Sequence, residues 1–232
     1  MPEQFCFQSF EETGFGIVHG AISEELLEDM SAAMDELARE GEPQADYGAR
    51  GLLEKSQRMR ELAAEPALLD LAKQVLGPHT RAVKGTFFDK NAEANWLVPW
   101  HQDLTITVRK QRDTPGYIHW AMKSGLLHVQ PPTSVMEGIV ALRIHLDDAS
   151  ADNGALRVLP GTHCRGRIPS KKIAELAETI PAVTCEAKRG DVLLMRPLLL
   201  HASSVSKAPK HRRVIHLEYA YEDLPDGLEW CG

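Results

Sequence analysis

Hydrophobic residues recur at helical spacing in two segments near the start of the chain. In the segment 22–41, one face of a helix would carry Leu26, Leu27, Met30, Met34 and Leu37. Ser23 is suited to cap the start of this helix, and Gly41 is suited to end it. A second helix is expected over 65–78. The pattern therefore predicts a helical N-terminal part that covers about the first 80 residues.

From about residue 81 the pattern changes to short apolar runs that are separated by turn residues. Five runs are predicted as strands: 82–90, 138–148, 155–163, 191–203 and 212–223. The second run alternates strictly, because Val140, Leu142, Ile144 and Leu146 would share one face, and Ala141, Arg143, His145 and Asp147 the other. Asn153-Gly154 is a turn signal that joins this run to the next.

Helices followed by a series of strands predict an α+β fold that is mainly β. The strands, over about 81–222, would form a sandwich or jelly roll, braced by the helices on one side. A chain of 232 residues suits a single domain, 1–232. A short helix is expected over 171–179. The segment 113–137 lacks clear periodicity and is expected to be a long loop, functional or disordered.

Charge and composition narrow the class of partner. The net charge is −7 and no basic stripe is present, which argues against nucleic acid. No uncharged apolar run approaches the roughly 20 residues of a membrane span, and the N-terminus does not resemble a signal peptide. The four cysteines are scattered without a CxxC pair, which favours a reducing, cytoplasmic location and argues against a zinc-thiolate site. We therefore expect a small-molecule substrate. No pattern in the sequence specifies an oligomeric state.

A histidine and an aspartate stand two residues apart in the sequence "PWHQDLTITVRK". Residues i and i+2 of a strand project from the same face, so His101 and Asp103 would point into one small volume. His201 lies at the end of the most apolar predicted strand, "DVLLMRPLLLH". Two histidines and one carboxylate form the facial triad of non-haem Fe(II) oxygenases, which leaves coordination positions open for a co-substrate and O2. These three residues are the candidate metal ligands.

A candidate co-substrate site follows eleven residues after His201. Such oxygenases often take electrons from 2-oxoglutarate, whose distal carboxylate is best held by an arginine. Alternation along 212–219 places Arg212 on the polar face, toward the pocket, and Arg213 at the outer edge. Ser203 shares a face with His201 and can offer its hydroxyl to the same carboxylate.

Several motifs together resemble the phytanoyl-CoA dioxygenase family of Fe(II)/2-oxoglutarate oxygenases. They are "WHQD" at 100–103, "LDDASADNGALRVLPGTH" at 146–163, "GDVLL" at 190–194, and "HASS" at 201–204 followed by Arg212. The resemblance covers about 86–221, with the motifs in the family's order. It implies a double-stranded β-helix (a jelly roll), iron held by His101, Asp103 and His201, and 2-oxoglutarate held by Arg212 and Ser203. The retained Asp103 implies hydroxylation or a related oxidation rather than halogenation.

The resemblance implies that a small organic metabolite is hydroxylated, with release of succinate and CO2. Candidate substrate contacts, from the 113–137 segment and the strands beside it, are Trp120, His119, His128 and Lys90. Arg143 stands where some family members carry an aromatic residue, and it can line the pocket or form a structural ion pair.

Two other functions use parts of the same pattern. A cupin-like hydrolase or isomerase with zinc or manganese needs the triad but has no use for Arg212. A non-enzymatic jelly-roll binding module would tolerate the loss of a ligand, yet all three ligands are present.

Overall fold

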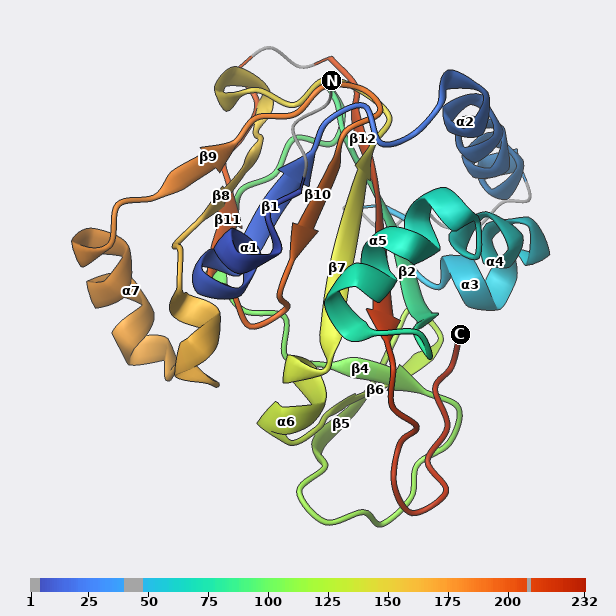
Figure 1. Cartoon of the computed structure of the whole chain (residues 1–232), viewed down its shortest axis with the longest axis vertical. Coiled ribbons are helices and arrows are strands. Elements are labelled where there is room, and N and C mark those ends of the chain that lie inside the picture. The colour runs from blue at the N-terminus through green and yellow to red at the C-terminus, as the bar shows by residue number, and fades with distance from the viewer. Residues whose placement is uncertain (1–4, 40–47, 208–209) are drawn as a thin grey trace.

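The computed structural model describes residues 5–39, 48–207 and 210–232. Its largest sheet has the strand order β1-β10-β7-β12-β2, and all its neighbouring strands are antiparallel. The strands of this sheet are β1 (Phe15–Val18), β2 (Arg81–Lys90), β7 (Ile139–His145), β10 (Val192–Met195) and β12 (Arg212–Ala220). Figure 1 shows this sheet in the middle of the molecule.

A second sheet has the order β3-β11-β8-β9. Its strands are β3 (Val98–His101), β8 (Leu156–Val158), β9 (Val183–Cys185) and β11 (His201–Ser203). Side chains of the two sheets line one cavity and bond across it, for example Lys90 of β2 with Ser203 of β11. A third sheet, β4-β6-β5, contains β4 (Ile106–Val108), β5 (Ile118–Lys123) and β6 (Leu126–Gln130). The predicted mainly β, jelly-roll fold is confirmed by this architecture of antiparallel sheets.

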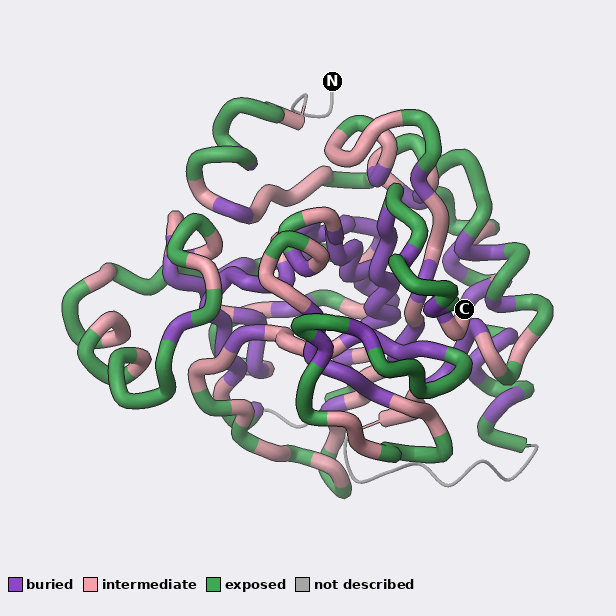
Figure 2. The backbone as a smooth tube through the Cα atoms, turned by 90° about the horizontal axis from the view of Figure 1, so that it is seen from below, coloured by how far each residue is buried: buried purple, intermediate pink, exposed green. Residues whose placement is uncertain are grey.

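Helices cover the outer face of the five-stranded sheet. They are α1 (Phe7–Thr13), α2 (Glu24–Arg39), α3 (Leu52–Lys55), α4 (Gln57–Ala63) and α5 (Pro66–Leu76), while α6 (Thr133–Glu137) and α7 (Ser170–Thr179) lie elsewhere. Leu27 and Met30 of α2 and Leu68 of α5 share one buried cluster with Leu142 and Leu217 of the sheet. The predicted bracing by helices on one side is therefore correct. Figure 2 shows the buried segments gathered in the middle of the molecule.

The two predicted N-terminal helices correspond to α2 and α5, and α7 matches the short helix expected over 171–179. The Ser23 hydroxyl accepts a hydrogen bond from the Leu26 N–H at 3.3 Å, as expected of a cap. The predicted stop at Gly41 lies outside the described residues. The N-terminal part is not wholly helical, because β1 pairs with β10 along the edge of the main sheet.

Two further predictions were wrong. The segment 113–137 is not a long loop, since it contains β5, β6 and α6. The run 191–203 is not one strand but two, β10 and β11, in different sheets. Pro197 interrupts this run, and proline cannot donate a ladder hydrogen bond. Among the helices that the structure describes, none has the length and hydrophobicity that a bilayer crossing requires.

Candidate metal and co-substrate site

Neighbouring strands of the second sheet bring the two candidate histidine ligands together. His101 ends β3 and His201 begins β11, and the two are register partners whose ring centroids lie 4.2 Å apart. Asp103 lies just beyond β3, where its N–H donates to the Pro197 carbonyl at 2.9 Å. The carboxylate oxygens of Asp103 lie 3.9 Å from His101 Nε2 and 3.6 Å from His201 Nε2. The predicted convergence is present, although the loop after β3, and not strand alternation, turns Asp103 inward.

Backbone carbonyls fix the orientation of both rings. The Nδ1 atom of His101 lies 2.9 Å from the Pro99 carbonyl, and that of His201 lies 2.8 Å from the Leu199 carbonyl. A carbonyl oxygen only accepts, so each Nδ1 carries the proton and each Nε2 presents a lone pair to the other members of the group. Burial lowers the pKa of His201 to about 4, which keeps its ring neutral at pH 7.

The third ligand is a carboxylate. Burial raises the pKa of Asp103, but attraction to the His201 ring, which is protonated in the acid range where Asp103 titrates, and to Lys84 outweighs that effect, and the net pKa lies well below its ordinary value. The three ligand atoms all lie within 4.8 Å of one another. Two imidazoles and one carboxylate are the donor set that suits Fe(II), so the residues present fit the metal. Within residues 5–39, 48–207 and 210–232, no other group of three such residues has this geometry.

The triad opens into a cavity of about 320 Å³ between the two larger sheets. The strands of the main sheet contribute most of its polar lining: Lys84, Thr86 and Lys90 from β2, Arg143 from β7, and Arg212, His216 and Glu218 from β12. Register pairs Lys90 with Arg212 at one end of these strands, and Lys84 with Glu218 six residues further along. The cavity therefore has two ends of different composition.

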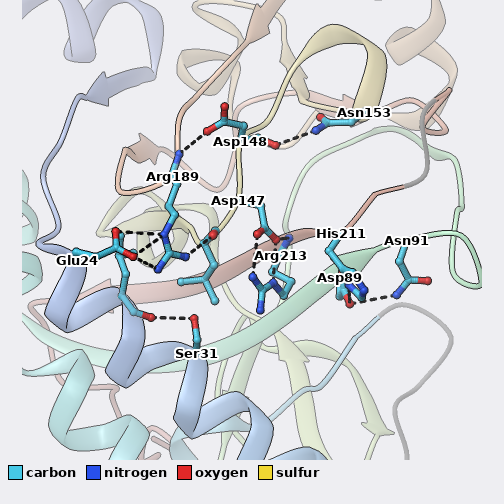
Figure 3. Close-up of polar contacts among 12 residues, drawn as sticks. Glu24, Ser31, Asp89, Asn91, Asp147, Asp148, Asn153, Arg189, His211 and Arg213 are labelled. Atoms are coloured by element: carbon cyan, nitrogen blue, oxygen red, sulfur yellow. Dashed lines mark hydrogen bonds and ion pairs between the residues drawn. The ribbon is translucent and has the colours of Figure 1, made fainter.

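The alternation predicted for β12 is confirmed. Arg212 is buried in the cavity wall and its Nε has no hydrogen-bond partner, while burial, and then the charge of Arg143, lowers its pKa to about 9. Arg213 points away from the cavity and forms two hydrogen bonds of 2.8 Å with the Asp147 carboxylate (Figure 3). Arg212 is thus a buried cation whose Nε is free for a carboxylate, and Arg213 is not.

Ser203 and Lys90 lie beside Arg212. The Ser203 hydroxyl donates to the Gly154 carbonyl at 2.8 Å and accepts from the Lys90 ammonium at 2.7 Å. Lys90 also donates to the Ser204 carbonyl, and it is fully buried. Burial, and then the charges of Arg212 and Arg143, lowers the pKa of Lys90 to about 7. Lys90, which the sequence suggested as a substrate contact, therefore lies at the Arg212 end of the cavity.

Arg143 lines the middle of the cavity. Its Nη1 lies 3.1 Å from His216 Nδ1, its Nε has no partner, and burial lowers its pKa to about 10. No ion pair of Arg143 is present among the residues that the structure describes. Of the two roles that the sequence left open, the structure places Arg143 in the pocket lining.

The other predicted substrate contacts do not line this cavity. Trp120 packs against a separate hydrophobic cluster, and His119 is exposed with a positive φ of 56°. His128 is buried in β6, where its Nδ1 lies 3.5 Å from the Thr105 hydroxyl. The segment 113–137 folds into a hairpin and a helix, and a role of these three residues in substrate binding stays a prediction.

The far end of the cavity contains residues that sequence reasoning missed. The Lys84 ammonium donates to the Glu218 carboxylate at 2.6 Å, and His216 Nε2 lies 3.5 Å from the same oxygen. Thr86 and Arg50 complete this end. Alternation could have found four of them, because Lys84 and Thr86 share a strand face with Lys90, and His216 and Glu218 share one with Arg212.

Comparisons with known proteins agree with this geometry. The model of the family described as "Phytanoyl-CoA dioxygenase (PhyH)" matches residues 10–214. The chain belongs to this family. The family resemblance drawn from the motifs is therefore confirmed.

Two curated relatives match over part of their length. L-proline trans-4-hydroxylase of Streptomyces griseoviridis is 24% identical over 180 residues, which are 66% of this chain and 59% of that protein. Dioxygenase sphC of Aspergillus fumigatus is 37% identical over 70 residues, 30% of this chain and 18% of that protein. The chain thus spans less than two thirds of the length of either relative.

Solved structures share the fold. AviO1 from Streptomyces viridochromogenes Tue57 has a TM-score of 0.67 at 23% identity and covers 95% of this chain and 94% of its own. EctD from S. alaskensis, solved with bound Fe, has a TM-score of 0.67 at 21% identity, with coverage of 92% and 74%. The carbocyclase SnoK from nogalamycin biosynthesis, described as non-haem and α-ketoglutarate dependent, has a TM-score of 0.73 at 18% identity, with coverage of 95% and 87%.

Proposed function

We propose that this protein is an Fe(II)- and 2-oxoglutarate-dependent dioxygenase that hydroxylates a small organic metabolite, with release of succinate and CO2. One observation carries the proposal: a His-Asp-His group with both Nε2 lone pairs turned inward shares one cavity with the buried cation Arg212. Membership of the phytanoyl-CoA dioxygenase family supports the same reaction.

The chain supplies binding, orientation and exclusion of water. His101, Asp103 and His201 would hold Fe(II), and Arg212 would neutralise the distal carboxylate of 2-oxoglutarate. When bound, iron and 2-oxoglutarate supply the oxidising chemistry by which one oxygen atom of O2 enters a C–H bond. The carbonyl partners of the two histidines fix which ring nitrogen faces the metal position, and the single charge of the carboxylate would partly offset that of Fe(II).

The cavity also bears on the class of substrate. Its volume of about 320 Å³ must accommodate both 2-oxoglutarate and the group to be oxidised, which favours a small metabolite. The polar end formed by Lys84, Thr86 and Glu218 lies away from Arg212 and is the available place for that substrate. Two similar proteins have names that refer to small molecules: one is L-proline trans-4-hydroxylase, and the other is EctD, which was solved with 2-oxoglutarate and 5-hydroxyectoine.

The two alternative functions explain less of the site. A cupin-like hydrolase or isomerase would use the three ligands but leave Arg212 buried without a purpose, at a substantial desolvation cost. A binding module would need neither the inward Nε2 atoms nor a carboxylate held ionised beside them.

The test is substrate-dependent succinate formation. The purified protein is incubated with Fe(II), 2-oxoglutarate and air against a library of small metabolites, and succinate and product masses are measured. We expect succinate only with Fe(II), and a product 16 mass units heavier than its substrate, since one oxygen atom is inserted. His101→Ala serves as the inactive control. Turnover that is supported by Zn(II) and needs no 2-oxoglutarate would instead establish the cupin-like alternative.

A further inference from the structure

Arg50 brings a positive charge to the cavity without an acidic partner. It is half-buried, forms an isolated bridge with Thr86 of β2, and lines the cavity that contains the triad. Within the described ranges its guanidinium forms no ion pair. The cavity lining contains two acids, Asp103 and Glu218, and Glu218 already accepts a hydrogen bond from Lys84 at 2.6 Å. A guanidinium is always protonated, so the charge of Arg50 is unbalanced.

Strand register places Arg50 at the end of the cavity away from Arg212. Its bridge partner Thr86 lies beside Lys84 and Glu218 in the sheet, whereas Arg212 pairs with the last residue of β2. Lys84 lies close enough to Asp103 for the charge of each to shift the pKa of the other. The Arg50 end is therefore next to the metal position, on the side that the co-substrate leaves open.

Lys84 has an N–H group to spare at this end. Its ammonium donates to Glu218 and, at 3.4 Å, to the Thr105 carbonyl, which uses two of its three N–H groups. Nδ1 of His216 accepts a hydrogen bond from Arg143, so Nε2 carries the ring hydrogen and points it toward Glu218 at 3.5 Å. Two donors thus hold Glu218 in place, and Lys84 can still donate into the cavity.

The charges at this end do not cancel. Arg50 and Lys84 are cations and Glu218 is an anion, which leaves one positive charge in excess among the described residues. Such an excess in a partly buried cavity is unfavourable and attracts an anion. In the proposed function the metal and Arg212 take up the charges of 2-oxoglutarate, so the co-substrate does not compensate it. A carboxylate carries one negative charge and matches the excess, whereas a phosphate monoester carries about two.

We propose that the primary substrate is a small organic acid, whose carboxylate binds to Arg50 and Lys84 while the carbon to be oxidised faces the metal position. This inference rests on the proposed function and names its substrate class. Arg50 offers the paired N–H groups that a carboxylate accepts. A neutral or cationic metabolite of the same shape would leave the excess charge unpaired and would bind more weakly.

A matched pair of probes tests the inference without turnover. Cyclopentanecarboxylate and cyclopentanecarboxamide have nearly the same shape and differ in charge. Their dissociation constants are measured by NMR titration of the protein loaded with Mn(II) and 2-oxoglutarate, so that the Arg212 end is occupied. The acid should bind about 10- to 100-fold more tightly than the amide, as expected for charge-assisted hydrogen bonds. Equal dissociation constants would overturn the inference, as would no binding of the acid at about 10 mM.

Arg50→Gln removes the charge at a half-buried position. It should weaken binding of the acid by about tenfold and leave binding of the amide unchanged, whereas Arg50→Lys, which keeps the charge, should retain most of the affinity. Arg81→Gln is the matched control, because Arg81 begins the same strand, pairs with Asp223 and does not line the cavity. Unchanged acid affinity in Arg50→Gln, or an equal loss in Arg81→Gln, would overturn the inference.

Relaxation of the probe protons shows where the acid binds. Mn(II) is paramagnetic, so a probe in the same cavity relaxes faster with the Mn(II)-loaded protein than with the Zn(II)-loaded protein. Equal relaxation rates would place the acid outside the cavity and overturn the inference. Uptake of 2-oxoglutarate is measured before a probe is added, which separates the two failures. If the unmodified protein does not bind 2-oxoglutarate, the proposed function is overturned, and the inference with it.

Discussion

Arg212 and Arg213 are consecutive in β12, yet they serve opposite sides of the sheet: Arg212 lines the cavity, and Arg213 pairs with Asp147 outside it. Arg212→Ala should therefore raise the 2-oxoglutarate dissociation constant by more than about a hundredfold, because a buried carboxylate loses a bidentate cation. Arg213→Ala should cost about 1 kcal/mol of stability and leave 2-oxoglutarate binding nearly unchanged, since its ion pair is partly exposed. Calorimetry and urea unfolding measure the two effects. Equal losses of 2-oxoglutarate affinity in the two variants would contradict the assignment of Arg212, and not Arg213, to the co-substrate.

A second prediction concerns Fe(II) binding at the candidate metal site. His101→Ala, Asp103→Ala and His201→Ala should each weaken Fe(II) binding by more than about a hundredfold, since loss of a direct ligand exceeds the effect of losing an outer partner. His211→Ala is the control, because that histidine is exposed and pairs with Asp89 on the outer surface (Figure 3). Anaerobic titration of each variant with Fe(II) gives the affinities. A variant that binds iron as tightly as the parent would remove that residue from the ligand set.

Two buried histidines outside the metal site predict a pH dependence of stability. Burial lowers the pKa of His128 and of His145 to about 4, below the value of about 6.5 in the unfolded chain. The unfolded state then binds more protons between about pH 4 and 6.5, so stability is present near pH 7 and falls as the pH drops through this window. Between pH 7 and pH 5 these two histidines alone should lower the free energy of unfolding by about 4 kcal/mol, as measured by urea unfolding. A free energy of unfolding that is the same at both pH values would contradict the burial of neutral rings.

The turn at Gly154 allows a fourth prediction. Gly154 has a φ of 79°, and a Cβ there would lie 2.6 Å from the Ser204 carbonyl oxygen and 3.1 Å from Lys90 Nζ. Gly125 has nearly the same φ, 77°, with no atom within 4 Å of its Cβ position. Gly125→Ala should cost about 1 kcal/mol for the left-handed backbone alone. Gly154→Ala should cost about 2 kcal/mol more and also weaken 2-oxoglutarate binding. Equal costs in thermal unfolding would show that the turn adjusts freely.

The sequence predicted the parts of the site that depend on strand alternation and local motifs. The faces of β7 and β12 were correct, because one face of each strand packs against helices and any shift of register would bury charges such as Arg213. The boundary between β10 and β11 was missed, although Arg196-Pro197 marks it, because both strands are buried and the residues on either side of that pair are apolar. Periodicity cannot show where such a run changes sheets.

Tertiary contacts explain the remaining differences. The hairpin of β5 and β6 is partly exposed on both faces and so lacks a clean alternation, although Ser124-Gly125 was a turn signal within it. The hydrogen bond from Lys90 to Ser203 joins two residues that stand 113 positions apart in the chain. No local pattern reports a contact of that kind.

His101 and His201 belong to the second sheet, whereas Arg212 belongs to the first. The distance between the two sheets is set by packing of the whole core. On the proposed function, an acid that joins the metal to Arg212 must match this fixed distance. Oxaloacetate, one methylene shorter than 2-oxoglutarate, and 2-oxoadipate, one methylene longer, would then each misplace one end of the molecule.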